Sequence, residues 1–408
     1  MSKIVITGMG AVTPIGIGVD EYWKNLIQGE CGIDYIKSFD TEEVPVKIAG
    51  EVKDFKPEEY MSKDLVRKMD AFMQYAYVAS EEALKMSELN IEPDNTGIVV
   101  GTAMGGISTI AFTQEELTKF SPKKVGPRFV PKILGNVTAA NIAINYNING
   151  PCFTVSTACS SGGDAINMAA MCIKAGKADT MLVVGGESAI CPIFIHSLSR
   201  AKALSHNNDN PKEASRPFDE GRDGFVIGEG GGALILETEE HALKRGAHIY
   251  AELLGCGNTE DGYHVTAPHP EGKGAIACMK QAIREANISP SEIGYVNAHG
   301  TSTGKGDIAE SKSIKEVFAD KLPMVSSTKG ATGHMMGAGG ITEVITCIKA
   351  IEDGIVPPTL NLEKVDEECA GIDFVPKEAK KADIKIAMSN AFGFGGQNSS
   401  VIVGKYER

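Results

Sequence analysis

The fold is decided by the stretch CFTVSTACSSGGDAINMAAMCIK, residues 152–174, which predicts a short strand that turns sharply into a helix. Residues 152–155 have the β-branched and aromatic content of a strand, and residues 164–173 are typical of a helix ended by Gly176. Few polar residues interrupt that helix, so we expect it to be buried on most of its faces. Cys159 then lies at the turn, between small residues that allow a tight backbone.

A cysteine at the start of a helix is a candidate nucleophile. Free N–H groups and the positive end of the helix dipole favour an anion there, here a thiolate. The layout follows that of a nucleophile elbow, with Cys159 in place of serine. An inert buried cysteine explains the same local pattern equally well. The choice between the two depends on partner residues elsewhere in the chain.

Composition limits the class of protein. The chain has 408 residues, 42% of them hydrophobic, which is enough for two or three domains. A formal net charge of −13 argues against general nucleic-acid binding. The nine cysteines contain no C-x-x-C pair, so neither a disulfide framework nor a zinc knuckle is indicated. With no membrane-length apolar run and no signal-peptide layout, we expect a cytoplasmic protein without a nucleic-acid or membrane partner.

Strands alternate with helices along the whole chain. This alternation predicts an α/β fold with largely parallel sheets. A Gly-x-Gly after the first strand suggests a dinucleotide fingerprint, but Thr13-Pro14 stands where the third glycine and the helix should be, so we reject that interpretation. The pattern restarts near residue 250, which predicts two similar halves. Apolar runs predict strands at 4–7, 97–101, 152–155, 181–184, 233–236, 249–254, 295–297, 324–325 and 384–388, with long helices at 61–89 and 340–351.

Two histidines in the second half are candidate partners of Cys159. His299 follows the strand at 295–297, and His334 comes shortly after the strand at 324–325. Because functional groups gather at the carboxyl ends of strands in α/β sheets, we expect both to share one crevice. Each is also explained as an ordinary histidine with a hydrogen-bond partner. Asp307 and Glu310 have the spacing of a helix capping box and are interpreted as structural.

Three chemistries fit one cysteine and two histidines. A Cys/His/His zinc site matches by ligand type but lacks the usual short spacings, so no metal is expected. A Cys–His hydrolase needs one histidine and leaves the other, with Lys329, unused. Acyl transfer with carbon–carbon bond formation uses all of them. Cys159 would carry an acyl thioester, and two neutral imidazoles would stabilise the enolate formed when a second thioester loses CO2.

The residues around these positions match a known family. Residues 157–161 (TACSS), 297–303 (NAHGTST) and the pattern Lys329-x-x-x-Thr332-Gly333-His334 resemble the β-ketoacyl-acyl carrier protein synthases, above all the synthase II type of fatty-acid elongation. Residues 67–74, 215–218, 223–229 and 393–396 extend the likeness over essentially the whole chain.

The resemblance implies a fold and a reaction. The fold is the duplicated thiolase fold, a five-layer αβαβα sandwich with two mixed sheets, normally a homodimer. The half at 1–248 would carry the nucleophile, and the half at 249–408 both histidines and a gate loop. The reaction is condensation of an acyl group with malonyl-acyl carrier protein, giving 3-oxoacyl-acyl carrier protein and CO2. No cofactor is expected beyond the carrier's 4'-phosphopantetheine, although a structural monovalent cation fits the family.

The resemblance also implies roles for single residues. Cys159 is the nucleophile, and His299 and His334 bind the malonyl carbonyl. Lys329 organises the site electrostatically and pairs with Glu343. The backbone N–H groups of Cys159 and Phe394 form the oxyanion hole. The positions matched to substrate binding are Thr301 and Thr303 at the pantetheine arm, Phe394 as the gate, Met104 and Phe225 near the acyl tunnel, and Thr266 in a loop at the mouth.

Departures from the family pattern touch the gate loop rather than the reactive residues. Gln397 stands in place of the usual threonine, and Ala391 in place of serine. Gly304-Lys305 stands where a proline often follows the Thr-Ser-Thr run at 301–303. These changes are expected to affect the choice of substrate and not the reaction. His264 and His269 resemble a metal pair, but their loop and the lack of further ligands favour a loop at the substrate mouth.

Other members of this fold remain alternatives. A degradative thiolase needs a second cysteine near the C-terminus, and the synthase III type needs an asparagine where this chain has His334. A type II polyketide ketosynthase uses the same three residues and is the nearest rival. A non-catalytic partner subunit of the chain-length-factor kind lacks the nucleophile. Basic residues of this acidic chain are expected to dock an acidic acyl carrier protein at the pocket mouth: Lys63, Arg67, Lys68, Lys123, Lys124, Arg128 and Lys202.

Overall fold

A single sheet runs through the protein in the computed structural model, which describes residues 3–121 and 125–408. Twelve of the described strands form this mixed sheet, and the other four form two small two-stranded sheets. Its order is β13 (Asp373–Phe374), β11 (Met324–Ser326), β10 (Tyr295–Asn297), β15 (Ile386–Phe392), β16 (Gln397–Gly404), β9 (Ala251–Glu260), β1 (Ile4–Thr13), β8 (Gly230–Thr238), β7 (Thr180–Glu187), β5 (Thr96–Gly101) and β6 (Cys152–Val155), with β2 (Gly16–Ile17) pairing to β1.

The order of strands repeats outward from the centre of the sheet. On one side of the centre, β1 is followed by β8, β7, β5 and β6, and on the other side β9 is followed by β16, β15, β10 and β11. The first two pairings are antiparallel on each side, and the last two are parallel on each side. The two expected sheets are joined into one, because Ile4–Ile6 of β1 pair with 251–253 of β9.

The expectation of largely parallel sheets was wrong for the central strands, which pair antiparallel. Helices cover both faces of the sheet, so antiparallel strands here are as continuously apolar as buried parallel ones, and hydrophobicity alone does not reveal strand direction. One central strand, β16, was not predicted at all. It follows directly on the glycine loop at 393–396, and the pattern of residues 397–404 mixes polar and apolar positions without a clear alternation.

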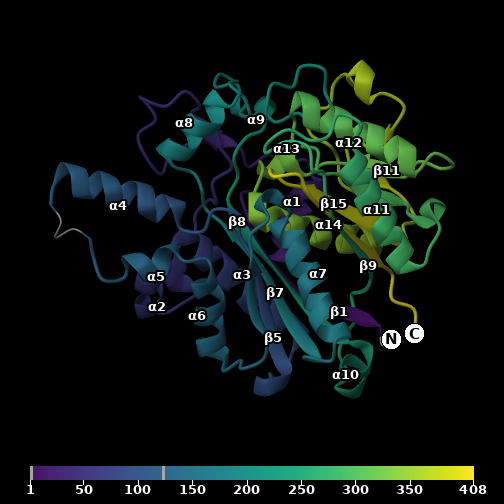
Figure 1. The fold of residues 1–408 in the computed structure, drawn as a ribbon, viewed down its shortest axis with the longest axis horizontal. Helices are drawn as coiled ribbons and strands as arrows, with labels where there is room; N and C mark the ends of the chain where they lie inside the picture. The colour runs from purple at the N-terminus through teal and green to yellow at the C-terminus, as the bar shows by residue number, and fades with distance from the viewer. Residues whose placement is uncertain (1–2, 122–124) are drawn as a thin grey trace.

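Helices and strands stack in five layers, which confirms the predicted fold class (Figure 1). The helices α3 (Ala71–Ser87) and α6 (Asn136–Tyr146) cover the outer face of the first half of the sheet. The helices α7 (Ser161–Lys174) and α14 (Gly339–Asp353) contact each other and strands of both halves, so they form the central layer. The helix α11 (Lys273–Ala286) covers strands β9 and β16 of the second half, and α12 (Gly304–Val317) packs on α11.

The predicted helix at 61–89 is two helices in the structure, α2 (Lys63–Lys68) and α3. The break comes at Met69 and Asp70, because the extended backbone of Asp70 caps α3 and its carboxylate accepts the Phe72 N–H at 3.2 Å. Other elements are α1 (Val19–Ile27), α4 (Ile107–Lys119), α5 (Phe129–Ile133), α8 (Pro192–Arg200), α9 (Pro211–Ala214), α10 (Glu239–Lys244), α13 (Lys329–Thr332), β3 (Asp34–Tyr35), β4 (Ile48–Ala49), β12 (Ile355–Val356) and β14 (Lys380–Lys381).

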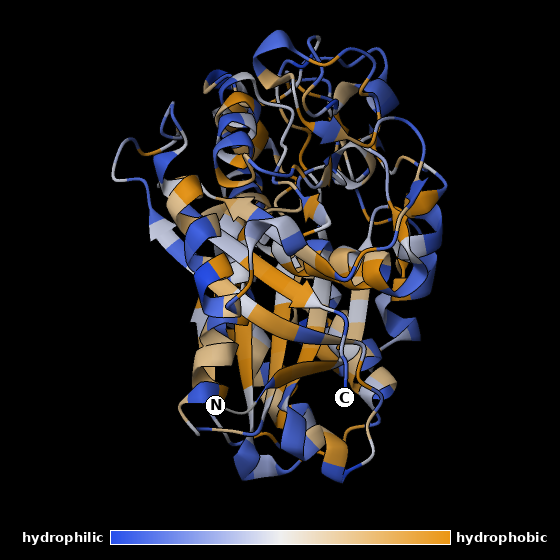
Figure 2. Ribbon diagram, turned by 90° about the vertical axis from the view of Figure 1, so that its right-hand side faces the viewer, coloured by the Kyte–Doolittle hydropathy of each residue, from blue (hydrophilic) through white to orange (hydrophobic). Residues whose placement is uncertain are grey.

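The hydrophobic core follows the sheet and the central helices. Strands coloured as hydrophobic run through the interior, and hydrophilic segments gather at the periphery (Figure 2). Ile166 of α7, Val183 of β7 and Ile345 of α14 are fully buried in one continuous cluster. This core holds the first turns of α7 and α14 side by side, near the site described below. In the described part of the chain, no helix combines the length and apolarity needed to cross a membrane.

Candidate active site

Cys159 lies on a strained turn between β6 and α7. Ala158 to Ser160 form a single 3-10 turn before α7 begins at Ser161. Ala158 has a φ of 50°, a left-handed conformation that costs a residue with a side chain about 1–3 kcal/mol. The gate loop packs directly on this turn, because a Cβ on Gly393 would lie 2.7 Å from the Thr157 carbonyl oxygen. The turn is therefore held in shape by a segment from the far end of the chain.

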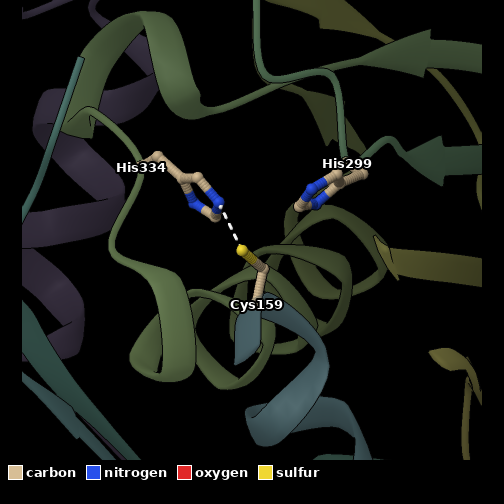
Figure 3. Close-up of side chains that lie close together, drawn as sticks. All are labelled: Cys159, His299 and His334. Carbon is tan, nitrogen blue, oxygen red and sulfur yellow. Dashed lines mark hydrogen bonds between the residues drawn. The ribbon is translucent and has the colours of Figure 1, made fainter. Parts of the chain in front are cut away.

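The structure brings the cysteine and both histidines together (Figure 3). Cys159 Sγ lies 3.0 Å from His334 Nε2. The rings of His299 and His334 meet edge to face, with centroids 5.2 Å apart and planes 81° apart. One donor atom from each of the three residues lies within 4.8 Å of the others. The crevice expected from the ends of separate strands is thus present, with the nucleophile before α7 and His334 before α14.

Each histidine is fixed by its backbone and by a neighbouring ring. The His334 N–H donates to the Val226 carbonyl at 2.7 Å, and its ring packs on Phe225 with centroids 5.3 Å apart. The His299 N–H donates to Glu310 Oε1 at 2.9 Å, and its ring packs near Phe392. Rings held in this way keep a fixed direction toward the cavity, which favours a site that acts without rearrangement.

Hydrogen bonding determines which ring nitrogen of His334 carries the proton. The Met336 backbone N–H donates to His334 Nδ1 at 3.3 Å, so Nδ1 is an acceptor. The proton of the neutral ring is therefore on Nε2, which points at Cys159 Sγ. Burial, together with the Lys329 charge, holds the pKa of His334 well below its usual range. The pKa of His299 is lowered for the same two reasons, with His334 adding to the effect.

The thiol of Cys159 is neutral at rest, which corrects the thiolate expected from the sequence. Burial raises its pKa to about 11, and the Phe394 backbone N–H and the Lys329 charge oppose this only in part. The helix α7 begins two residues after the cysteine, so its N-terminus does not outweigh the loss of solvation. The Cys159 thiol and the His334 ring are therefore both uncharged at neutral pH.

A buried ion pair lies behind the histidines. Lys329 Nζ bonds Glu343 Oε1, and the two side chains are only 3% and 4% exposed. Burial raises the pKa of Glu343, and the neighbouring ammonium of Lys329 acts in the opposite direction. The pairing that the family resemblance implied is present. The ammonium group adds to burial in lowering the pKa of both imidazoles.

The geometry does not favour a zinc ion bound by these three residues. Zn–S and Zn–N bonds at a tetrahedral angle place the two donor atoms about 3.6 Å apart. Cys159 Sγ and His334 Nε2 are closer than that, at 3.0 Å, and Nε2 already carries the proton that a metal would displace. The arrangement is that of an N–H donor facing a sulfur.

A cavity of about 720 Å³ surrounds the three residues and reaches the surface. Its apolar walls include Phe194, Leu198 and Met336. His264 also lines it and uses Nδ1 to accept the Thr266 and Ala267 N–H groups, so it organises the mouth loop rather than a metal site. All the positions matched to substrate binding line this cavity: Met104, Phe225, Thr266, Thr301, Thr303 and Phe394.

The basic residues expected to dock a carrier are divided between two cavities. Lys202 lines the cavity of the site. Arg67 and Arg128 line a second cavity of about 730 Å³, between α3, α4 and α5. Lys63 and Lys68 lie on α2, where Lys68 pairs with Asp64 at 2.6 Å. Lys123 and Lys124 lie outside the described residues.

Two buried carboxylates that support the site were missed or misinterpreted. Glu310 does not belong to a capping box; it accepts the N–H groups of His299 and Gly300. Glu187 was not singled out from the sequence. Its carboxylate accepts the N–H groups of Ala103 and Gly337, and so links the loop after β5 to the turn after His334. Burial raises the pKa of each carboxyl to about 7. The signal in the sequence is weak: Glu187 is an acidic residue at the end of an apolar strand, and Glu310 lies within α12.

Comparisons with known proteins agree with this geometry. Residues 1–242 match the family described as beta-ketoacyl synthase, N-terminal domain, and residues 250–363 match its C-terminal domain. The chain belongs to the beta-ketoacyl synthase family. It is 45% identical over 409 residues to a 3-oxoacyl-[acyl-carrier-protein] synthase 2 of Vibrio harveyi, covering 99% of this chain and 98% of that protein.

Solved structures place this beta-ketoacyl synthase among ketosynthases. A beta-ketoacyl synthase from Burkholderia phymatum superimposes with a TM-score of 0.92 at 34% identity, covering 100% of both chains. A type II PKS ketosynthase, bound to a hexaketide in complex with its acyl-carrier protein, superimposes with a TM-score of 0.89 at 31% identity over 99% of this chain and 100% of that one.

Proposed function

We propose that this protein condenses an acyl group, held as a thioester on Cys159, with malonyl-acyl carrier protein, giving 3-oxoacyl-acyl carrier protein and CO2 in fatty-acid elongation. The observation that carries the proposal is a sulfur 3.0 Å from a neutral Nε2–H, with a second neutral imidazole beside it in the same cavity. The full-length similarity to a 3-oxoacyl-[acyl-carrier-protein] synthase 2 supports it.

The first step is acyl transfer to Cys159. The sulfur attacks the carbonyl carbon of the acyl-carrier thioester, and the carrier sulfur leaves. The thiol proton ends on the carrier thiol, so the step is balanced without added acid or base. A thiol with a pKa of about 11 is a weak nucleophile at rest, and the Nε2–H of His334 stabilises negative charge as it develops on sulfur.

The second step forms the carbon–carbon bond. The malonyl thioester loses CO2, and the enolate oxygen is held by N–H groups of His299 and His334. The enolate carbon attacks the acyl carbonyl, whose oxygen is stabilised by the backbone N–H groups of Cys159 and Phe394. Collapse of this intermediate expels the Cys159 sulfur, which takes up one proton. Neutral imidazoles suit this role, since an imidazolium would protonate the carbanion.

The test is a condensation assay with acyl-carriers of graded length and malonyl-carrier. Wild-type protein is expected to release one CO2 per 3-oxoacyl product, and Cys159→Ala to form no acyl-enzyme and no product. Iodoacetamide should label Cys159 and abolish condensation. Full condensing activity in Cys159→Ala would refute the covalent mechanism.

A type II polyketide ketosynthase is the second candidate function, because the same three residues serve it and one structural relative is of that kind. Repeated extension of one chain without intervening reduction would favour it. A chain-length-factor-like partner subunit is less well supported, because the thiol of Cys159 lies in hydrogen-bond contact with His334. The products of the graded-length assay separate the three.

We also propose an acidic acyl carrier protein as the partner. Lys202 lines the mouth of the cavity, and Lys63 and Arg67 lie on the exposed helix α2. Charge reversal at each of these should slow association in a salt-sensitive way and leave the chemical steps unchanged. Unchanged carrier kinetics after charge reversal at Lys63 and Arg67 would refute the docking proposal.

A homodimer through the edge of the sheet is the third part of the proposal. In the described chain, β6 is the last strand of the sheet and pairs only with β5. Phe153 on this strand is 47% exposed, and Ile144 of the adjacent α6 is 81% exposed. An apolar, unpaired edge is a surface that proteins cover, and antiparallel pairing of two copies would cover it. Phe153→Asp should convert a dimer to a monomer in light scattering; unchanged mass would refute this interface.

The remaining predictions concern domains, cofactor and compartment. The two halves proposed as domains, 1–248 and 249–408, would contribute the nucleophile and the histidines respectively. No organic cofactor is needed beyond the carrier's pantetheine arm. A structural monovalent cation is part of the same prediction, and replacing potassium with a bulky organic cation should then lower thermal stability. The nine unpaired cysteines support a reducing cytoplasm.

A further inference from the structure

We propose that Asp164 is a positioning residue for the nucleophile: its carboxylate locks Thr157, and with it the strained turn of Cys159, to the second half of the chain. The proposal rests on the condensing function above, in which Cys159 carries the acyl group. It adds a residue that neither the reaction nor the family motif requires.

The carboxylate of Asp164 receives hydrogen bonds from both halves of the protein. Thr157 Oγ1 donates to Oδ2 at 2.6 Å, from the residue two positions before the nucleophile. Asn258 Nδ2, on β9 of the second half, donates to Oδ1 at 2.7 Å. The residue is only 6% exposed. One buried side chain therefore joins the nucleophile turn to a strand almost a hundred residues away.

An ordinary capping role does not account for these contacts. Asp164 lies in the first turn of α7, where an acidic residue commonly accepts backbone N–H groups. Here the donors are the side chains of Thr157 and Asn258, and the backbone N–H of Thr157 donates to Ser161 Oγ. Burial raises the pKa of Asp164 even though these donors oppose it, so the site retains a carboxyl that is costly to bury. The cost of burying this carboxyl indicates that its contacts with Thr157 and Asn258 have a role in the site.

The role of Asp164 is to maintain the geometry of the reacting atoms. Ala158, between Thr157 and Cys159, is in the left-handed region with a φ of 50° and relaxes unless its neighbours are fixed. Thr157 is fixed on its side-chain face by Asp164 and on its carbonyl face by the Ser160 hydroxyl at 2.7 Å and the close approach of Gly393. Without Asp164, the Cys159 sulfur and its N–H lose their set direction toward His334 and the acyl carbonyl.

The experiment is a double-mutant cycle on Asp164→Ala and Thr157→Val. Each variant removes one end of the same hydrogen bond. The rate of Cys159 acylation by acyl-carrier is measured in single turnover, together with KM for the carrier and the rate of iodoacetamide alkylation. Thr7→Val is the matched control, because it removes a buried threonine–carboxylate bond to Glu237 far from the site. Thermal melting checks that every variant is folded.

A positioning role predicts three results together. Each single variant slows acylation roughly tenfold or more, in line with the cost of a misplaced reacting atom. The double variant is no more than about threefold slower than the slower single variant, since both act through one contact. KM for the carrier stays unchanged. Asn258→Ala, which removes only the arm from β9, slows acylation less than Asp164→Ala, and Thr7→Val stays within about twofold of wild type.

Other outcomes overturn the proposal. Acylation at the wild-type rate in Asp164→Ala, or losses in the two single variants that multiply in the double variant, would show that Asp164 does not act through Thr157. A rise in KM with unchanged acylation rate would also refute it. If the wild-type protein is alkylated at Cys159 but never acylated, the condensing function fails instead. The alkylation rates of the same variants, with the same test of additivity, then decide the positioning role.

Discussion

The ion pair between Lys329 and Glu343 allows a prediction in which stability and reactivity separate. Both side chains are almost completely buried, at 3% and 4% exposure. Removing one member leaves a buried charge without its partner, which costs about 3–5 kcal/mol of unfolding free energy. Lys329→Met and Glu343→Gln should therefore both lower stability in urea titrations. The double variant should recover most of the loss, because it leaves no unpaired charge.

The same two variants should move the thiol of Cys159 in opposite directions. The positive charge of Lys329 lowers the pKa of Cys159, and the negative charge of Glu343 raises it. Lys329→Met should therefore shift the alkylation profile to higher pH, and Glu343→Gln should shift it to lower pH. With a thiol pKa of about 11, the thiolate fraction at pH 7 is on the order of 10⁻⁴, so the rate should rise about tenfold per pH unit.

The assay is the rate of iodoacetamide alkylation of Cys159 between pH 6 and 10. Glu237→Gln is the control, because Glu237 is also a fully buried carboxylate with a basic partner, Arg245, but lies far from the thiol. It should lose stability without moving the profile. Two profiles that shift the same way, or single variants within about 1 kcal/mol of wild type, would refute the electrostatic role assigned to the pair.

Three further predictions follow from the contacts around the site. Gly393→Ala should lower kcat about tenfold, because its Cβ would lie 2.7 Å from the Thr157 carbonyl oxygen; steady-state condensation at the wild-type rate would contradict this. Glu310→Ala should slow malonyl decarboxylation while thiol alkylation stays unchanged, because the His299 loop loses the acceptor of two N–H groups; equal loss in both assays would count against it. Burial raises the pKa of Glu187 to about 7, so the folded protein binds a proton that the unfolded chain releases above about 4.5, and stability falls as pH rises between these values. Glu187→Gln should make the unfolding free energy fall less steeply between pH 5 and 7, and an identical slope in urea titrations would refute the assignment.

Much of the fold could be predicted because its elements are encoded locally. The small residues around Cys159 and the apolar run after them predict a turn and a buried helix, and both are present. The strand ends before His299 and His334 place both rings at one edge of a sheet, whichever direction its other strands run. Motifs of this kind depend on the size and chemistry of adjacent residues, which a sequence displays directly.

Other features depend on burial and on partners far along the chain. Strand direction in the middle of the sheet, and the joining of two sheets into one through β1 and β9, follow from packing that apolar strands of either direction satisfy equally. The roles of Glu310 and Asp164 depend on donors that only folding brings near, from a loop in one case and from another strand in the other.

The protonation of the site residues shows most clearly what the sequence alone predicts and what requires the tertiary structure. By itself the sequence determined which groups are candidates for the reaction, because a cysteine on a small-residue turn and two histidines next to glycines are chemical identities that no folding step alters. The tertiary structure decided their charge. Burial in the cavity wall keeps the Cys159 thiol protonated against the opposing charge of Lys329, whereas burial and the Lys329 charge act together to keep His334 neutral, since a charge is destabilised where it loses solvation.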